Sequence, residues 1–592
     1  MDSDINLKVP PLSPSERGEL LSGVWADWQL SQLSVPSALL REDVPLPVAA
    51  ALVRRGITDT HALRRYLSPS WDALEHPYAL PDVEKAVEYL HEAITKGKGI
   101  YVVADYDVDG TTSAALLGDF FEKVGHKKYR LHIPNRFTEG YGVSELALRQ
   151  ALEGGYHLFI TADCGTKEHH RLALLRKAGL TIIVLDHHAL GEGDVYPPAD
   201  AFVNPQRQDT DYSNPYLSGA GVVFKVLQAY VERFQHPVEW VWEWIDLVAV
   251  SLLADIMPLI GENRTLVQLG LERLQEAPRP GLAALMKAAR LDPSFPLRSR
   301  QVVYQLVPRL NAPGRLKDAR YTLYLLLQRS LSKEVEQVAL YLDKLNRHRQ
   351  HLQEQVLRAA HAQLEKEYPG ILTGQREPPP AFVVVGKDWG KGIVGLVAAK
   401  LTEHFHRPSV VLTQDEAGYL TGSARSPSEF PLHDLLSTHC RPYLLKFGGH
   451  DRAAGLSLAP DKVERFREAF MAACAAQQPA RRRAFIDAQL AAEELQEVRI
   501  ASWCDRFEPI GPGNEAPRFL IRGLRLWRVE NERLLFASGG NLYEAHARIP
   551  FDQLKPYLAQ MKEEGLPLVA TPRLRPSGGV ELRLRDILPQ GY

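Results

Sequence analysis

The chain has 592 residues, of which 45% are hydrophobic and 24% charged, and its formal net charge is −2. This length and composition place it among ordinary globular proteins with about four domains. The near-neutral charge excludes a uniformly basic surface, so nucleic acid could be bound only through local clusters of Arg and Lys.

Cysteine usage and the N-terminal residues indicate the compartment. The four cysteines are widely scattered and have no zinc-binding spacing, which fits a reducing environment. Residues 1–12 are acidic where a secretory signal would be basic, and no apolar run approaches the 18 residues of a membrane-spanning helix. We therefore expect a cytoplasmic protein that makes no membrane contact.

The N-terminal part precedes the first strong strand pattern. Residues 1–40 are polar and contain Pro, which predicts a partly ordered extension in which Trp25 and Trp28 could dock on the body of the protein. From Val44 to about Glu92, helical patterns interrupted by Gly and Pro predict a lead-in. Together with the α/β region that follows, this lead-in forms a predicted domain over residues 41–315.

The first chemically informative stretch is IYVVADYDVDGTTS, which begins at Ile100. The apolar run to Ala104 predicts a buried strand, and the residues from Gly110 predict an amphipathic helix that ends near Phe121. Between them lie three carboxylates within five residues, namely Asp105, Asp107 and Asp109. These acids cannot all be ionised side by side without a cation, although a solvated acidic turn is the alternative for this stretch alone.

Two later stretches repeat this arrangement. The strand-forming run HLFIT (157–161) precedes Asp163, and TIIVL (181–185) precedes Asp186, His187 and His188. If the three strands are neighbours in one parallel sheet, these side chains converge at its carboxyl edge, where open α/β sheets bind ligands. Oxygen donors with one or two imidazoles suit Mn²⁺ or Mg²⁺, so we predict a site for two such ions.

A fourth acid, Asp255, closes the apolar run from Leu247 to Ala254. An Asp in this position is either a helix-end residue whose oxygens are satisfied locally or another metal ligand. Taken alone, the first interpretation is the stronger one. Beside the three strand-end stretches, we favour the second.

Two Pro/Gly segments supply further candidates. HIPNRFTEGYG (132–142) predicts a loop that carries Arg136 and Tyr141, and VPRLNAPGRLK (307–317) predicts a loop that carries Arg309, Asn311 and Arg315. Solvated surface is the alternative for both segments. Arg is nevertheless well suited to phosphate, because its planar fork can bind two oxygens at once.

A long helix is predicted between Ser332 and Tyr368, a stretch without Gly or Pro in which apolar residues recur at helical intervals. It lies in a predicted connecting region over residues 316–370, and a coiled-coil arm is the alternative. Upstream, Trp240, Trp242 and Trp244 alternate at a spacing that cannot put all three on one helix face. They are predicted to be packing residues.

Two more domains are predicted C-terminal to this helix. Residues 371–477 alternate strand and helix patterns and include a predicted loop, GSARSP (422–427). A second predicted loop with Gly448, Gly449 and His450 could hold an anion through backbone N–H groups and the imidazole. Residues 478–592 consist of short alternating segments that predict a small β-barrel.

The barrel pattern places basic and aromatic residues at alternate positions, as an OB-fold requires to track a single nucleic-acid strand. A solvated sheet face is the alternative. The residues concerned are Arg522, Arg525, Arg528, Arg573, Arg575, Arg583 and Arg585, with Phe519, Trp527 and Phe536 nearby.

The ordered motifs DYDVDG, ADCG, LDHH, GAG (219–221) and ADIMPL resemble those of the DHH phosphoesterases. Each motif is short, but five in this order are hard to obtain by chance. From about Val44 to the C-terminus, the pattern resembles the bacterial members that degrade single-stranded DNA. The resemblance implies a multidomain α/β fold: a parallel-sheet catalytic domain, a connecting helix, a DHH-associated substrate domain and a terminal OB-like barrel.

The resemblance also implies an activity, a processive 5′→3′ exonuclease that releases 5′-mononucleotides from single-stranded DNA with a 5′ phosphate. Asp107, Asp109, Asp163, His187 and Asp255 would bind the cations, Asp105 would support the first of them, Asp186 would orient the imidazoles, and His188 would donate to the phosphate. The implied substrate contacts are Arg136, Tyr141, Arg309, Asn311, Arg315, Ser423, Arg425, Gly448, Gly449 and His450. Of these, Ser423 and Arg425 would hold the terminal phosphate.

One departure from the family pattern occurs at Trp389, where relatives usually read W-H-x-G and this chain has Gly390 and Lys391. Any contact of that His is in doubt, unless Lys391 replaces it. Two other functions stay open: hydrolysis of oligoribonucleotides, cyclic dinucleotides or pyrophosphate, and a non-catalytic scaffold that binds single strands. The expected partners are a single-strand-binding protein and a helicase, and a monomer is expected.

Overall fold

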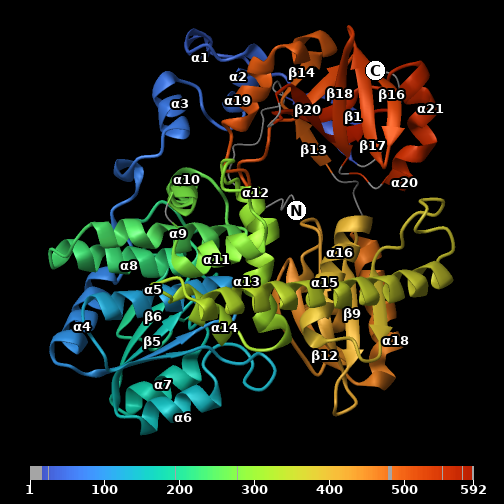
Figure 1. The fold of residues 1–592 in the computed structure, drawn as a ribbon. Helices are drawn as coiled ribbons and strands as arrows, with labels where there is room; N and C mark the ends of the chain where they lie inside the picture. The colour runs from blue at the N-terminus through green and yellow to red at the C-terminus, as the bar shows by residue number, and fades with distance from the viewer. Residues whose placement is uncertain are drawn as a thin grey trace. The chain divides into compact units, whose positions relative to one another are not determined.

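The structure is a computed structural model (Figure 1) that describes residues 17–23, 26–191, 193, 195–276, 278–477, 483–547, 549, 551–575 and 578–589. Its contacts divide the chain into two units, one of residues 68–349 with 508–514 and one of residues 1–67, 350–507 and 515–592. None of the helices in the described ranges combines the length and the apolar character that crossing a bilayer requires.

The first unit is built on a five-stranded parallel sheet in the order β4-β3-β5-β6-β7. Its strands are β3 (Gly99–Ala104), β4 (Tyr129–His132), β5 (Tyr156–Ala162), β6 (Thr181–Leu185) and β7 (Ala201–Val203). The three strands that were predicted to deliver acids are therefore neighbours, as expected. Side chains alternate between two cores: Ile100 and Val102 belong to one, Tyr101 and Val103 to the other.

Helices cover both faces of this sheet (Figure 1). The core containing Tyr101 is shared with α6 (Glu145–Glu153) and α7 (His169–Lys177). The core containing Ile100 is shared with α4 (Val83–Thr95), α5 (Val108–Lys123), α8 (Gly219–Arg233) and α9 (Glu239–Ala254). A sheet that is buried on both faces explains why its strands are almost uniformly apolar.

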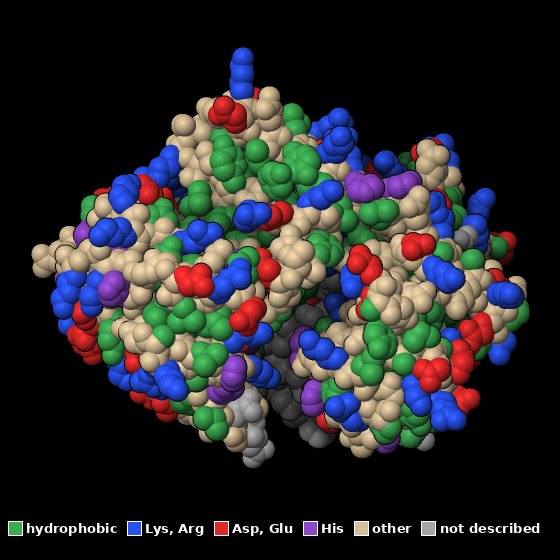
Figure 2. All heavy atoms as spheres, turned by 90° about the horizontal axis from the view of Figure 1, so that it is seen from below, with side chains coloured by type: hydrophobic (Ala, Val, Ile, Leu, Met, Phe, Trp, Pro, Cys, Tyr) green, Lys and Arg blue, Asp and Glu red, His purple; other side chains and the backbone are tan. Residues whose placement is uncertain are grey.

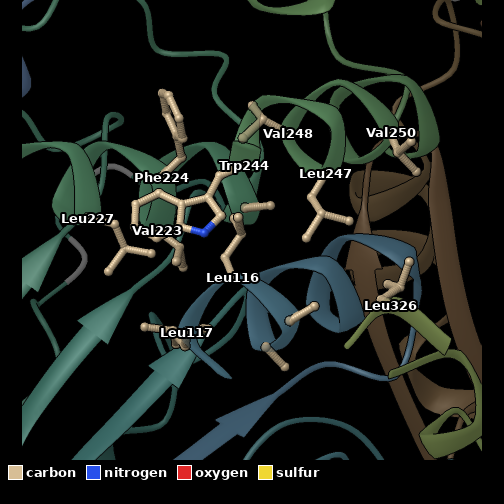
Figure 3. Close-up of a cluster of buried hydrophobic side chains, with 14 of the residues drawn as sticks. Leu116, Leu117, Val223, Phe224, Leu227, Trp244, Leu247, Val248, Val250 and Leu326 are labelled. Atoms are coloured by element: carbon tan, nitrogen blue, oxygen red, sulfur yellow. The ribbon is translucent and has the colours of Figure 1, made fainter. Parts of the chain in front are cut away.

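The packing of α5, α8 and α9 fixes the geometry of the later site. Figure 3 shows Leu116 and Leu117 of α5 beside Val223 and Phe224 of α8 and the indole of Trp244. Trp244 is fully buried, and Trp240 and Trp242 pack partly buried against the same core. The prediction that these tryptophans are packing residues is confirmed.

The rest of this unit is helical. Its remaining helices are α10 (Gly261–Glu276), α11 (Pro280–Ala288), α12 (Ser299–Gln301), the π-helix η3 (Val302–Leu306), α13 (Val307–Leu316) and α14 (Arg320–Leu326). The prediction of a loop over residues 307–317 is wrong, because α13 covers almost all of it. Pro308 lies in the first turn, where its missing N–H costs nothing, and only Pro313 interrupts the ladder.

The predicted long helix is confirmed as α15 (Lys333–Glu367), which has 35 residues. Val335, Ala339 and Leu342 near its start are buried in the core of the first unit. Ala360 and Leu364 are buried near its end, in the part that belongs to the second unit. Buried positions of this kind favour packing within the protein over a free coiled-coil arm.

Residues 381–477 of the second unit form an α/β sheet in the order β11-β12-β10-β9-β8. Its elements are β8 (Phe382–Gly386), α16 (Lys391–Phe405), β9 (Ser409–Gln414), β10 (Leu420–Arg425), α17 (Leu432–Asp434), the π-helix η4 (Leu435–Cys440), β11 (Lys446–His450), β12 (Ala453–Leu458) and α18 (Val463–Ala476). The segments GSAR and GGH were predicted to be loops, which is wrong: they are the C-terminal parts of β10 and β11.

The C-terminal region contains a seven-stranded sheet in the order β14-β15-β19-β20-β18-β17-β16. Its elements are β14 (Ala488–Ala491), α19 (Val498–Asp505), β15 (Phe519–Arg522), β16 (Arg525–Glu530), β17 (Arg533–Ser538), β18 (Asn541–Ala547), α20 (Phe551–Leu554), α21 (Leu558–Glu563), β19 (Leu568–Leu574) and β20 (Val580–Ile587). Between the described residues of the edge strands β14 and β16 no pairing closes the sheet, so a closed OB-like barrel stays a prediction.

The expected basic and aromatic face of this sheet is only partly present. Phe519 and Phe536 are buried in the core, so Trp527 is the exposed member of the predicted aromatic trio. Arg573 is buried and pairs with Asp505 at 2.7 Å. Three more of the predicted arginines, Arg528, Arg575 and Arg583, form ion pairs with glutamates on strands of the same sheet.

Within the stretch expected to be a partly ordered extension, residues 17–22 and 27–31 form strands, and Trp25 lies outside the described residues. Strands β1 (Arg17–Ser22) and β2 (Asp27–Ser31) form a three-stranded sheet with β13 (Arg483–Ile486). Trp28 is buried against residues of β15 and β19, and its indole N–H donates to Asp586 at 2.7 Å. The anticipated docking of Trp28 therefore occurs, on the C-terminal sheet.

The helix α1 (Ser37–Arg41) precedes the predicted lead-in, and α2 (Leu46–Val53) and α3 (Thr60–Leu67) form its start. All four cysteines are buried and unpaired. Figure 2 shows Lys and Arg side chains interspersed with Asp and Glu over the face in view, in keeping with the small net charge.

Candidate metal centre and substrate contacts

The predicted acids and imidazoles meet at the carboxyl edge of the parallel sheet. Asp105 follows β3, Asp163 follows β5, and Asp186 with His187 follows β6. Asp107 is the N-cap of α5 and accepts a hydrogen bond from the N–H of Gly110 at 3.1 Å. Because parallel strands end at the same edge, neighbours in the sheet bring together residues that are far apart in sequence.

Three groups of these side chains have the spacing of metal ligands. Within each group, one ligand atom from every residue lies within 4.8 Å of the others. The groups are Asp105, Asp107 and Asp163; Asp109, His187 and Asp255; and Asp163, Asp186, His187 and His188. All eight predicted catalytic residues belong to at least one group, and Asp105 stands as a potential direct ligand.

His187 lies at the centre of this arrangement. Its Nε2 is 3.2 Å from Asp163 Oδ1, 3.5 Å from Asp109 Oδ2 and 3.7 Å from Asp255 Oδ2. Asp255 is the C-cap of α9 and its carboxylate faces His187, so its role as a metal ligand stays a prediction. Asp163 has the left-handed φ of 58°, a strained conformation that is concentrated at functional sites.

Asp109 is held by the N-terminus of α8. Its oxygens accept hydrogen bonds from the N–H groups of Gly219 at 2.7 Å and Ala220 at 2.8 Å. A Cβ at Gly219 would lie 2.5 Å from the Cβ of Asp163, so only glycine permits this approach. The glycines of the GAG motif therefore let the N-terminus of α8, the positive end of its dipole, contact Asp109 directly beside Asp163.

Asp186 orients the segment that carries the two histidines. It accepts hydrogen bonds from the N–H and hydroxyl of Thr166 at 2.9 and 2.6 Å, and from the N–H of His187 at 2.8 Å. His188 Nδ1 lies 2.7 Å from the same carboxylate. With Nδ1 engaged in this way, Nε2 of His188 is the ring nitrogen left for a ligand.

Burial and charge set the protonation of these groups. Burial raises the pKa of Asp105, Asp163 and Asp255 well above the ordinary range, and neighbouring carboxylates raise it further. Burial lowers the pKa of His187, which favours the neutral imidazole that binds metals. Burial opposes the charged form of His188, but Asp186 outweighs it and raises the pKa of His188 to about 10.

The donor set fits divalent cations. Among the described residues, Oδ1 of Asp105 is buried and has no hydrogen-bond donor. A buried acceptor without a partner, surrounded by further carboxylates, is costly unless a cation is bound. Carboxylates with one or two imidazoles match the preferences of Mn²⁺ and Mg²⁺.

Arg136 and Tyr141 lie beside these acids. The guanidinium of Arg136 is 4.2 Å from the ring centroid of Tyr106, which lies between Asp105 and Asp107. The ring of Tyr141 makes edge contacts with Tyr106 at 6.4 Å and with His188 at 6.2 Å between centroids. Tyr141 is 49% exposed and the imidazole of His188 is exposed as well, so both rings are accessible to a ligand beside the acids.

The three candidates on α13 differ in their surroundings. Arg309 is bound within the protein, to Asp343 at 2.9 Å and to the carbonyl of Gln305 at 2.6 Å, which favours a structural role. Asn311 and Arg315 are half-buried. A Cβ at Gly314 would lie 2.6 Å from the carbonyl oxygen of Tyr106, so α13 contacts the acidic loop directly.

The candidates in the second unit share one face of a sheet. Ser423 aligns with Gly455 of β12, which aligns with Gly448 of β11. Arg425 aligns through Ala453 with His450 in the same way. Residues that are paired across neighbouring strands point to the same side of a sheet. Ser423, Arg425 and His450 therefore lie on one face, separated by small residues, and their side chains can bind an anion.

This face also contacts α16. A Cβ on Gly395 would lie 3.2 Å from both Ser423 Oγ and Arg425 Nη2. Gly390 is the N-cap of α16 and Lys391 is exposed in its first turn. The other glycine of the motif, Gly449, has a φ of 147° and lies on the edge strand β11 with an exposed backbone.

Sequence reasoning missed several residues that hold the acids in place. Thr166 and Ser251 donate hydrogen bonds to Asp186 and Asp109, yet nothing in the sequence distinguishes them from other core hydroxyls. Ser218 could have been found, because a Ser directly before a helical pattern is a typical N-cap.

Two protein families match parts of the chain. The DHH family, N-terminal domain, matches residues 99–252, and the DHHA1 domain matches residues 379–476. The single-stranded-DNA-specific exonuclease RecJ of Escherichia coli (strain K12) is 34% identical over 451 residues, which cover 73% of this chain and 75% of that protein.

The RecJ exonuclease of Bacillus subtilis (strain 168) is 35% identical over 421 residues, which cover 71% of this chain. The match spans about half, 51%, of the Bacillus protein. The crystal structure of RecJ in complex with Mn²⁺ from Thermus thermophilus has a TM-score of 0.75 and 27% identity, covering 94% of this chain and 78% of that one.

Proposed function

The chain belongs to the RecJ family of DHH proteins, and on this premise we propose that it is a metal-dependent 5′→3′ exonuclease that degrades single-stranded DNA to 5′-mononucleotides. Its role is in DNA repair and recombination. The observation that carries the proposal is the convergence of three metal-ligand groups, with a buried, unpartnered oxygen of Asp105, at one sheet edge among the described residues.

Within this proposal, Asp107, Asp109, Asp163, His187 and Asp255 would hold two divalent cations, Mn²⁺ or Mg²⁺, and Asp105 would complete the first site. Such ions, when bound, lower the pKa of water and neutralise charge on a phosphate. Asp186 fixes the orientation of the histidine segment. His188, with its pKa raised to about 10, is protonated at neutral pH and donates to a phosphate oxygen.

Arg136 and Tyr141 form the substrate side of this centre. The Arg136 guanidinium binds phosphate oxygens, and the exposed ring of Tyr141 offers a surface for a sugar or base. Asn311 and Arg315 extend the contacts along α13, while Arg309 holds that helix through Asp343.

We further propose that Ser423 and Arg425 hold the terminal 5′ phosphate, and that His450 contacts the substrate backbone beside Gly448 and Gly449. The aligned sheet rows support this, because small residues leave room for a phosphate beside one guanidinium and one imidazole. Lys391, exposed in the first turn of α16, supplies positive charge where relatives have His.

Our proposal for the cellular setting is a cytoplasmic monomer that acts with a single-strand-binding protein and a helicase. The four buried, unpaired cysteines support a reducing compartment.

The function is tested by incubating the full chain with 5′-phosphorylated single-stranded DNA, with and without Mn²⁺, beside a five-nucleotide RNA and a cyclic dinucleotide. We expect mononucleotides from the DNA in the presence of Mn²⁺, and a label at the 3′ end to be released last. Faster turnover of the RNA or the cyclic dinucleotide would make this a small-substrate phosphodiesterase. Binding of DNA without hydrolysis in Mn²⁺ would favour the scaffold function.

The terminal-phosphate site makes a separate prediction. Replacing Arg425 with Gln should raise the KM for 5′-phosphorylated DNA by about 10- to 100-fold with little change in kcat, because a charged hydrogen bond contributes about 1.5–3 kcal/mol. Substrate with a 5′ hydroxyl should be unaffected. Lys400→Gln, which removes an exposed positive charge from α16, is the matched control. An equal loss on both substrates would contradict a phosphate contact.

A further inference from the structure

A chain of buried hydroxyl groups ends on Asp109. The Ser251 hydroxyl on α9 lies 2.5 Å from Asp109 Oδ1 and 2.6 Å from the hydroxyl of Ser218. Ser218 is the N-cap of α8, and its oxygen accepts a hydrogen bond from the N–H of Gly221 at 3.2 Å. Both serines are fully buried, so water cannot replace any link of this chain.

The direction of every proton in the chain is fixed. An ionised Asp109 can only accept, so the single proton of Ser251 must point at its carboxylate. The proton of Ser218 must then point at Ser251, and the Gly221 N–H points at Ser218. Hydrogen bonds aligned in one direction polarise and strengthen one another.

These hydrogen bonds leave Asp109 with one oxygen atom that can bind a cation. Oδ1 accepts from both Ser251 and the N–H of Ala220, which occupies both of its lone pairs. Oδ2 accepts from the N–H of Gly219 and faces His187 at 3.5 Å. The remaining lone pair of Asp109 is therefore on the side of His187.

Ser251 also fixes the position of a second acid. Its carbonyl accepts the N–H of Asp255 at 2.9 Å, the last hydrogen bond of α9. The residue that binds Asp109 through its side chain thus positions Asp255 through its backbone. Asp109 and Asp255 are the two carboxylates of the metal-ligand group formed by Asp109, His187 and Asp255.

We propose that Ser251, supported by Ser218, is a positioning residue for one of the two cations, the one bound by Asp109, His187 and Asp255. Its hydroxyl restricts Asp109 to a single ligand oxygen. Within the described residues, the Ser251 hydroxyl bonds to Asp109 and Ser218, and the Ser218 hydroxyl bonds to Ser251 and the N–H of Gly221. Neither hydroxyl bonds to Asp105, Asp107 or Asp163, so that group is formed independently. This inference rests on the proposed two-metal function.

The test is calorimetric titration of the metal-free full chain with MnCl₂ in the absence of DNA. We expect two classes of site in the unsubstituted protein. Ser251→Ala should weaken one class by about 10- to 100-fold, the usual contribution of a residue that orients a metal ligand, and leave the other unchanged. Asp255→Asn identifies the class, because it removes a ligand that belongs only to this group.

Two further variants control for folding and for loss of a buried hydroxyl. Ser113→Ala removes a buried hydroxyl on α5 that makes no hydrogen bond among the described residues, and it should titrate like the unsubstituted protein. Ser218→Ala interrupts the chain without touching Asp109 and should weaken the same class.

The possible results separate the two proposals. An unchanged isotherm for Ser251→Ala, or equal weakening of both classes, overturns the role of Ser251 while leaving the metal centre intact. Fewer than two classes in the unsubstituted protein contradicts the two-metal function itself, and the role of Ser251 with it.

Discussion

Replacing Asp109 with Ala is expected to reduce hydrolysis of single-stranded DNA by at least about 1,000-fold, well beyond the 10- to 100-fold contributed by residues that only orient a metal ligand. Oδ2 of Asp109 lies 3.5 Å from Nε2 of His187, and both residues belong to one metal-ligand group. Loss of the Asp109 carboxylate therefore removes negative charge where a cation is to be bound. Affinity for DNA should stay within a few-fold, because Arg136, Tyr141 and the face of β10 are untouched.

Turnover is measured by release of mononucleotides in Mn²⁺, and binding by fluorescence anisotropy of labelled DNA without divalent metal. Ser113→Ala on the same helix serves as the control and should keep full activity. His187→Ala should reproduce the loss, because His187 contacts three of the acids. Substantial residual turnover in either purified, folded variant would remove the case for this centre.

The second large effect concerns stability. Replacing Trp28 with Ala should destabilise the C-terminal sheet by about 3–5 kcal/mol, the usual cost of deleting a buried aromatic side chain. The indole is 1% exposed, packs against β15 and β19, and donates to the fully buried Asp586. Its loss leaves a cavity and also takes a donor from a buried carboxylate.

Hydrogen exchange followed by mass spectrometry resolves this effect, because it reports opening of β13, β15 and β19 separately from the other unit. Trp527→Ala is the matched control, since this Trp on β16 of the same sheet is 49% exposed. Equal acceleration of exchange in both variants would show that Trp28 does not anchor the N-terminal strands.

The sequence predicted which acids and histidines meet at the site more accurately than it predicted the secondary structure of the segments around the site. The strands before Asp105, Asp163 and Asp186 are short apolar runs closed by acids, a pattern that marks both the strand and its functional end. Their pairing as neighbours followed from the expected parallel sheet. The contact of Ser251 with Asp109 did not, because it depends on how α5, α8 and α9 pack. The contact of Thr166 with Asp186 depends on the turn that follows β5.

Residues 307–317 and the segments GSAR and GGH were misassigned for a common reason. Pro and Gly favour loops locally, but Pro308 lies in the first turn of α13, and the glycines of β10 and β11 lie in a sheet that needs small residues. The strands at residues 17–22 and 27–31 were not predicted, because β2 pairs with a strand at residues 483–486, a partner that no local pattern reveals.

Because of that pairing, the three-stranded sheet that contains β2 cannot be completed until β13 has been synthesised. Strand β2 ends at residue 31 and its partner β13 begins at residue 483, so 452 positions (483 − 31) separate them. At about 5–20 residues per second, a ribosome needs roughly 20–90 s to make the partner. Residues 68–349 are synthesised in that interval, during which β2 can pair with β1 but not yet with β13.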